Sequence, residues 1–166
     1  MNLPDTVTYI GQNAFTNYRG DGDMKVAINE LPSSLETIGF SAFQSAGPNV
    51  HITKIPNKVK VLPMMVFNNL PNCKITSFGS SDGTAQLEEI LENALQWAGI
   101  GSWGPDVTRI EIHSSVKSIG IGAFENYAQD TLEAALFAKY DAADDGAYGV
   151  TYSEMGLDDK VHLEAL

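Results

Sequence analysis

The feature that most constrains this chain is a unit of 13 residues that ends in an apolar side chain and recurs along most of the sequence. Clear copies, each closing on phenylalanine, occupy residues 3–15, 31–43, 55–67 and 112–124, and a degraded copy occupies residues 83–95. The closing residues lie 28, 24, 28 and 29 positions apart. Similarity at a period in the twenties predicts a solenoid, because one short unit cannot bury its apolar face alone and stacked units can.

Each unit predicts two short strands with a turn between them. β-Branched residues alternate before a proline in residues 26–32 and 50–56, as in a strand that ends where proline removes a ladder donor. When these prolines are aligned, Ile28 falls beside Ile52. A second short strand follows the turn and ends on an inward isoleucine. Gly39 comes directly after one such isoleucine, and we expect it to take a positive φ at the corner.

The degraded fourth unit, residues 83–95, leaves two interpretations open. It follows an insertion at residues 80–84 and closes on Leu95 instead of phenylalanine. Its apolar residues fit a strand-like coil, but the same residues also fit the spacing of an amphipathic helix. The sequence alone does not choose between the coil and the helix.

Composition excludes several classes of protein. The chain has 166 residues, of which 43% are hydrophobic, and this is enough for one domain with a continuous core. Its formal net charge of −11 argues against nucleic acid as a partner, because phosphates would be repelled. No apolar run approaches the roughly 18 residues of a membrane helix, so membrane insertion is not expected. Cys73 is the only cysteine, so packing has to supply the stability that an internal disulfide would add.

The repeats resemble the BspA-like leucine-rich-repeat family, whose units read L-x-x-I-x-I-P-x-x-V-x-x-I-x-x-x-A-F. The resemblance covers about residues 3–127 and rests on a motif that recurs at constant internal spacing. The family's units often place a cysteine three residues after the phenylalanine, where this chain has other residues. The resemblance implies a curved right-handed solenoid that binds other molecules, commonly on bacterial or protozoan surfaces. It implies no catalytic residues, and we expect that the protein is not an enzyme.

The predicted fold is therefore an α/β-type repeat solenoid, rich in β-structure, with about four and a half coils over residues 1–127. Residues 128–166 have no repeat signature, and we predict an acidic helical segment there that caps the solenoid. Within this segment, residues 131–140 fit an amphipathic helix with Leu132 and Leu136 on its apolar side.

The tail also carries a loose match to a calcium-binding loop of the EF-hand type. Asp141, Asp145 and Glu154 occupy ligand-like positions, and calcium takes six to eight oxygen ligands at fixed offsets. Ala143 replaces one ligand, and two extra residues separate the loop glycine from Val150. The sequence leaves open both a calcium site and an ordinary acidic connection.

The predicted binding surface is the row of outward side chains on the first strand of each coil. No Ser-His-Asp set, phosphate-binding glycine loop or paired zinc ligands can be assembled, so no catalytic or cofactor-binding residues are predicted. The row is comparatively basic, which favours an acidic patch on a partner. It comprises Lys25, Ala27, Asn29, His51, Thr53, Lys74, Thr76, Arg109 and Glu111.

The predicted function is binding of a protein or a glycan without catalysis, in surface adhesion or recognition. The alternative is a structural subunit of a larger assembly, such as a phage or cell-surface appendage. The predicted location is extracellular or at the cell surface, with the virion and the cytoplasm as alternatives because no secretion signal is visible. The first unit keeps only Leu3 and Pro4 of its first strand, so we expect another domain or subunit to cover its apolar end.

Overall fold

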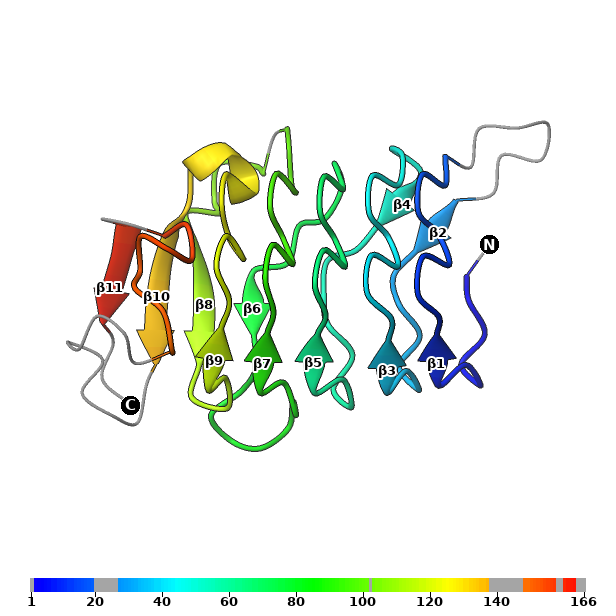
Figure 1. Cartoon of the computed structure of the whole chain (residues 1–166), viewed down its shortest axis with the longest axis horizontal. Coiled ribbons are helices and arrows are strands. Elements are labelled where there is room, and N and C mark those ends of the chain that lie inside the picture. The colour runs from blue at the N-terminus through cyan, green and yellow to red at the C-terminus, as the bar shows by residue number, and fades with distance from the viewer. Residues whose placement is uncertain (1, 20–26, 102, 138–147, 158–159, 164–166) are drawn as a thin grey trace.

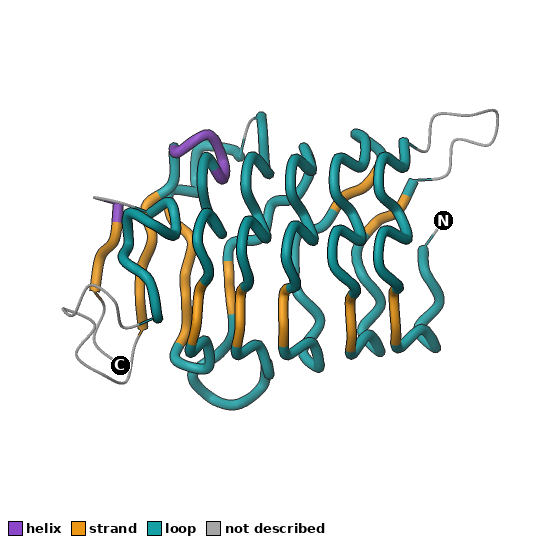
Figure 2. Tube along the Cα trace, in the orientation of Figure 1, coloured by secondary structure: helices purple, strands orange, loops and turns teal. Residues whose placement is uncertain are grey.

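Successive repeats wind into coils that stack along one axis, with the N-terminal coil at one end and the C-terminal strands at the other (Figure 1). The computed structural model describes residues 2–19, 27–101, 103–137, 148–157 and 160–163. Within each coil, short strand segments alternate with turns and irregular backbone (Figure 2). Five coils carry the second of the two predicted strands, which places the fold in the class of β-solenoids.

Two walls of strands run along the stack. The second-strand wall consists of β1 (Tyr9–Ile10), β3 (Thr37–Ile38), β5 (Val61–Leu62), β7 (Glu89–Ile90) and β9 (Ser118–Ile119). The first-strand wall consists of β2 (Ile28–Asn29), β4 (Val50–His51), β6 (Ser77–Phe78), β8 (Arg109–His113), β10 (Glu133–Phe137) and β11 (Val161–Leu163). The strand pairs within the described residues are parallel, as they must be when each coil returns the chain to its starting edge.

The closing phenylalanines form a spine inside the stack, as the repeat pattern predicts. The rings of Phe15 and Phe43 stack with their centroids 5.1 Å apart, and those of Phe43 and Phe67 lie 6.0 Å apart. Backbone bonds hold the same register, since the Phe15 N–H donates to the Ala42 carbonyl at 2.7 Å. Leu95 breaks the line of rings in the fourth coil, and Phe78 compensates from β6 by packing edge-on against Phe124 at 5.1 Å. That makes five stacked coils with one continuous interior.

The corner after the second strand is made differently from the prediction for Gly39. Gly39 does not take a positive φ; the left-handed residue is Ser41, two positions later, with φ 54°. The glycine is needed for space instead, because a Cβ at Gly39 would lie 2.3 Å from the backbone nitrogen of Gln12 in the preceding coil. The same holds at Gly120, where a Cβ would lie 2.5 Å from the nitrogen of Glu92.

The fourth unit is a coil, and its helical interpretation is wrong. The Leu91 N–H donates to the Leu62 carbonyl at 2.9 Å, and the Leu95 N–H donates to the Ala123 carbonyl at 2.8 Å. The ladders on both sides thus bind residues 83–95 as a strand-like coil, and this outweighs the local helical spacing. The inserted residues 80–84 lie in a loop outside the stack (Figure 1).

The predicted C-terminal helix is also wrong within the residues that the structure describes. Residues 133–137 form β10, which pairs in parallel with β8 on one side and β11 on the other. Leu132, Ala134 and Leu136 are buried at the two-residue period of a strand, and the small side chain of Ala135 between them is buried as well. The open edge of β8 offers ladder partners that a helix could not use. The helical backbone in the described part of the chain is the 3₁₀ turn η1 (Tyr127–Asp130) and the single residue Lys160 before β11.

Residues 148–157 add a shorter sixth turn that covers the last full coil. The Ile119 N–H donates to the Tyr148 carbonyl at 3.1 Å, and the Phe124 N–H donates to the Met155 carbonyl at 2.8 Å. Met155 is fully buried. The cap on the solenoid, to the extent that it is described, is therefore another turn of coil. No helix among the described residues is long and apolar enough to span a lipid bilayer.

Candidate binding surface

The N-terminal half of the predicted row brings Asn29, His51 and Thr53 together, in a register that differs from the alignment of the prolines. β2 pairs Ile28 with Val50 and Asn29 with His51, a shift of two residues from the predicted pairing of Ile28 with Ile52. Glu30 adds side-chain bonds that stabilise this register. It takes a left-handed conformation (φ 68°), and its carboxylate accepts the Thr53 backbone N–H at 3.0 Å and also the Thr53 hydroxyl.

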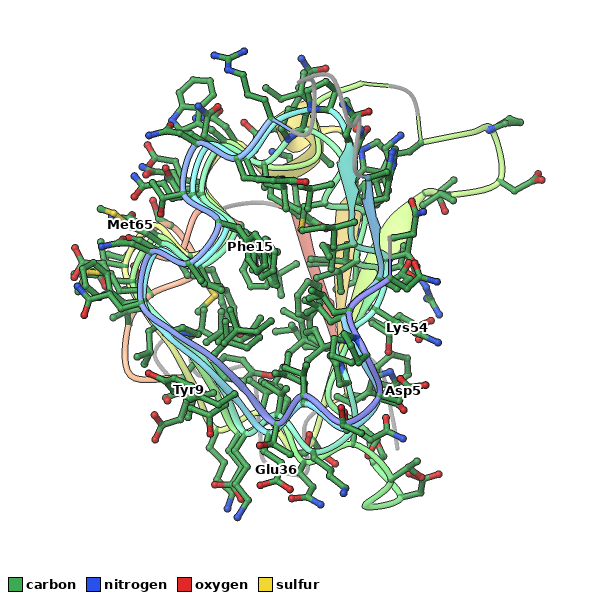
Figure 3. All side chains as sticks on the ribbon, turned by 90° about the vertical axis from the view of Figure 1, so that its right-hand side faces the viewer. Asp5, Tyr9, Phe15, Glu36, Lys54 and Met65 are labelled. Carbon is green, nitrogen blue, oxygen red and sulfur yellow. The ribbon has the colours of Figure 1, made fainter. Side chains whose placement is uncertain are left out.

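A polar hollow lies beside this first group. It measures about 350 Å³ and is bordered by Asn29 and Glu30 on one coil and by Lys54 and Asn57 on the next. Figure 3 shows Lys54 and Asp5 projecting on this side of the stack. Lys25, which the sequence also assigns to this row, lies outside the described residues, and Ala27 is half-buried.

The C-terminal half of the row brings Thr76, Arg109 and Glu111 together. The Glu111 N–H donates to the Thr76 carbonyl at 2.7 Å, which fixes the two strands side by side. These three residues border a shallow hollow of about 360 Å³, with Asp106 among its other lining residues. Lys74 lies between the two halves and is half-buried, with its N–H bonded to the Ile52 carbonyl at 2.7 Å.

The charge of this half is more balanced than the sequence predicts. The Arg109 guanidinium donates to the Glu111 carboxylate at 2.9 Å, and the His113 ring lies 3.4 Å from the same carboxylate. Glu111 thus links two basic side chains of one strand, and it offsets the cation that was expected to attract an acidic partner. What remains is a fixed array of donors and acceptors in a shallow hollow.

Sequence reasoning missed a cluster that β10 and β11 add to this surface. The Phe137 ring stacks on His113 with centroids 4.9 Å apart, and the Arg109 guanidinium lies 5.9 Å from the same ring. Between β11 and β10, the His162 ring lies 2.7 Å from the Glu133 carboxylate. The alternation of Leu132, Ala134 and Leu136 is the signal that could have found these residues, because it turns positions 133 and 137 outward.

Glu154 is the one predicted calcium ligand among the described residues. The Glu154 carboxylate accepts the Thr151 N–H at 2.8 Å, and the Thr151 hydroxyl accepts the Glu154 N–H at 3.1 Å. This reciprocal pair closes the sixth turn. Asp141 and Asp145 lie outside the described residues, so the calcium site stays a prediction. Elsewhere in the described part of the chain, no three His, Cys, Asp or Glu side chains are grouped as metal ligands.

Cys73 and Tyr127 are buried and serve the core. The Tyr127 hydroxyl donates to the Ile75 carbonyl at 2.7 Å, deep between the third and fifth coils. Burial raises the pKa of the Cys73 thiol and, together with the neighbouring thiol, the pKa of the Tyr127 hydroxyl. Both groups are therefore protonated at neutral pH, and Cys73 has no thiolate character with which to act as a nucleophile.

The N-terminal end of the stack is open. Figure 3 looks onto this end and shows Phe15 inside the first coil. Leu3, Val7 and Phe15 are only partly buried, whereas Phe43 in the next coil is fully buried.

Comparison with known proteins matches this architecture. The family model described as "BspA type Leucine rich repeat region" matches six times over residues 1–126. The chain belongs to this family. The BspA-type match covers the five coils and ends directly before η1, and it leaves the tail of β10 and β11 outside.

Among solved structures, the BspA-type chain is similar to a leucine-rich repeat protein from Bacteroides ovatus, at 18% identity and a TM-score of 0.32. The alignment covers 82% of this chain and 49% of that protein, so the chain spans about half its length. The comparison with curated proteins gave no match.

Proposed function

We propose that this BspA-type chain binds a protein or a glycan, without catalysis, through its first-strand wall. The observation that carries the proposal is the hollow bordered by Thr76, Arg109 and Glu111, beside the ring pair that His113 of β8 forms with Phe137 of β10. The hollow offers hydrogen bond donors and acceptors, and the ring pair offers an apolar platform. Polar groups that fix orientation and an aromatic surface for apolar contact are the features by which proteins bind other proteins and sugars.

The scaffold under this surface supports such a role. Ile110 and Ile112 of β8 are buried between the outward residues, and β6 and β10 flank the strand on both sides. Outward side chains on a strand paired at both edges lose little further freedom on binding, so the entropy cost of recognition is small. A concave or flat wall of parallel strands is also how solenoids commonly present a binding surface.

The test is binding of purified chain to an array of glycans and to extracellular proteins, compared with Lys74→Glu combined with Arg109→Glu. We expect this variant to lose the partner that the wild type selects, by at least about tenfold in Kd, since interfacial charge reversal commonly costs more than 1.4 kcal/mol. Lys60→Glu, on the opposite wall, is a control for charge reversal away from the proposed surface and should bind as the wild type does. If both variants bind equally well, the first-strand wall is not the binding surface.

We further propose that the protein acts at the cell surface, in adhesion or recognition, as the family resemblance suggests. Protease treatment of intact cells that produce the native protein is a direct check. Loss of the chain from intact cells supports the proposal, and protection until the cells are broken contradicts it.

A structural role in a larger assembly is the second candidate, and the open N-terminal end favours it. In the second coil, the Gly39 N–H donates to the Ile10 carbonyl at 2.7 Å, and the Ala42 carbonyl accepts the Phe15 N–H. The equivalent groups of the first coil are the Gly11 N–H and the Ala14 carbonyl, and within the described residues no further coil lies beyond them. We propose that a coil of another domain or subunit covers this end. Sedimentation that finds only monomer at high concentration argues against a second subunit there.

A further inference from the structure

Large apolar side chains are exposed together on the second-strand wall of the first three coils. Tyr9 is 62% exposed, Phe40 41% and Met64 40%. Phe40 and Met64 hold equivalent positions in neighbouring coils, since the Ser41 N–H donates to the Met64 carbonyl at 3.0 Å. The Tyr9 ring leans over Gly11, with Cε1 3.7 Å from where a side chain on Gly11 would begin. With half-buried Val61 of β5, these residues form what we call the apolar patch: Tyr9, Phe40, Val61 and Met64.

Two carboxylates border the apolar patch on the fourth coil. Glu89 pairs in register with Val61. Glu92 lies one coil beyond Met64, because its carbonyl accepts the Met65 N–H at 3.2 Å. Both side chains are exposed, and within the described residues neither makes an ion pair, whereas neighbouring Glu88 lies 4.0 Å from Lys117. The wall therefore runs from three apolar coils to one coil with two uncompensated negative charges.

The spacing of the coils fits a helical ligand. Parallel strands repeat at about 4.8 Å, and an α-helix advances about 5.4 Å per turn, so a helix along the stack places one side chain over each coil. Those side chains fall at positions i, i+4, i+7 and i+11 of the helix. An extended strand in the same place advances about 6.6 Å between side chains of one face, and it is out of step within two coils.

We propose that the second-strand wall binds an amphipathic helix of a partner protein. Three apolar turns of the helix lie over the apolar patch, and a fourth turn with Lys or Arg lies over Glu89 and Glu92. Aromatic and Met side chains are enriched in such interfaces. Beside the patch, between Thr37 and Val61, the wall has a hollow of about 490 Å³ whose lining also includes Glu36, Lys58 and Lys60. The net charge of −11 speeds the approach of a basic helix.

This surface is separate from the first-strand wall. Figure 3 shows Tyr9 and Met65 on one side of the stack and Lys54 on the other. The proposal therefore does not depend on the glycan or protein binding proposed above, and variants of one wall serve as controls for the other.

The test uses the whole chain and a synthetic helix of about 18 residues, with leucine at positions 3, 7 and 10 and lysine at positions 13 and 14 of an alanine–glutamine background. A second peptide carries glutamate in place of both lysines. Fluorescence anisotropy at two salt concentrations measures both affinities. We expect the lysine peptide to bind at least about tenfold more tightly than the glutamate peptide, and we expect this ratio to shrink as salt rises.

Two double variants locate the binding. Phe40→Ser with Met64→Ser should weaken both peptides by at least about tenfold, since anchors in the patch are lost. Glu89→Gln with Glu92→Gln should bring the two peptides to nearly equal affinity. Lys74→Glu with Arg109→Glu, on the first-strand wall, should leave both affinities unchanged. All four positions in the first two variants are exposed, so unfolding midpoints should stay near that of the wild type. The proposal is overturned if the wild type binds both peptides with equal affinity. It is also overturned if the Phe40 and Met64 variant binds the lysine peptide as tightly as the wild type does, or if the Glu89 and Glu92 variant keeps the wild-type preference for that peptide.

Discussion

Replacing a corner glycine with alanine should have opposite effects in two coils that the sequence makes equivalent. At Gly39, the new Cβ would lie 2.3 Å from the nitrogen and 2.7 Å from the Cα of Gln12, both backbone atoms of the first coil. Ordinary contact begins near 3.4 Å, so the two coils must separate by about 1 Å. At Gly11, the nearest atom is Cε1 of Tyr9 at 3.7 Å, which is ordinary contact.

The expected cost follows from the contacts that hold the first two coils together. Overpacking of this kind costs about 1–3 kcal/mol. Separation also stretches the bond from the Gly39 N–H to the Ile10 carbonyl (2.7 Å) and that from the Asn13 N–H to the Phe40 carbonyl (3.1 Å), at about 1 kcal/mol each. Gly39→Ala should therefore lower the free energy of unfolding by about 3 kcal/mol, or about 6–12 °C in Tm. Gly11→Ala should be neutral or should stabilise by up to about 1 kcal/mol, because alanine restricts the unfolded chain.

Guanidinium unfolding followed by far-UV circular dichroism measures both variants against the wild type. Gly120→Ala is an independent repeat of the experiment in the fifth coil, where the Cβ would lie 2.5 Å from the Glu92 nitrogen. If Gly39→Ala and Gly11→Ala shift the midpoint by the same amount, close approach of the coils is not the reason for these glycines.

Three further predictions concern the spine, the sixth turn and alkaline pH. Phe43→Ala should lower the free energy of unfolding by about 3–5 kcal/mol, because Phe43 is fully buried. Phe15→Ala should lower it by about half as much, because Phe15 is half-buried. Thermal unfolding that shows equal losses for both variants would contradict the open end. Glu154→Ala should weaken the sixth turn by about 0.5–2 kcal/mol through loss of its bond to the Thr151 N–H, seen as faster hydrogen exchange at Phe124, with Glu125→Ala as the control. Burial raises the pKa of Tyr148 to about 12 and that of Tyr127 well above its usual value. Because the folded state favours the neutral phenol, this stability is full below pH 10 and is lost as pH rises towards 12 and beyond. Tyr148→Phe should flatten the fall in Tm between pH 10 and 12, and an unchanged fall would show that Tyr148 is not responsible.

The spine and the second-strand wall could be predicted from sequence because their inward positions all have the same requirement, which is an apolar side chain. An inward residue of every coil must be apolar, and the residues of β1, β3, β5, β7 and β9 fall at constant spacing from the closing phenylalanine or leucine. The first-strand wall departs from the alignment by two residues between β2 and β4, and a bond from Glu30 to the next coil stabilises that register. Such a bond depends on a neighbour in space, and no pattern within one repeat encodes it.

The helical prediction for residues 131–140 is wrong because the spacing of Leu132 and Leu136 does not reveal which strands lie beside them. Ala134 and Ala135 favour a helix in isolation. In the folded chain they meet the open edge of β8, and five register pairs between β8 and β10 outweigh that preference. The candidate site was therefore only half predicted. Arg109 and Glu111 were named from the repeat, but Phe137 and His162 enter through strands that carry no repeat signature.

Outward residues on the walls vary from coil to coil, whereas the inward residues hardly vary. This difference matters for recognition, because a ligand contacts the outward residues. On the second-strand wall, the inward residues Ile10, Ile38, Leu62, Ile90 and Ile119 are nearly interchangeable, whereas their outward neighbours are Tyr9, Thr37, Val61, Glu89 and Ser118. Stacking needs only the inward set, so the outward set is free to differ from coil to coil. A ligand that spans several coils meets a distinct side chain at each step of about 4.8 Å. Specificity on such a wall is therefore read along the axis, and exchanging the outward residues of two coils should change the preferred ligand without changing the fold.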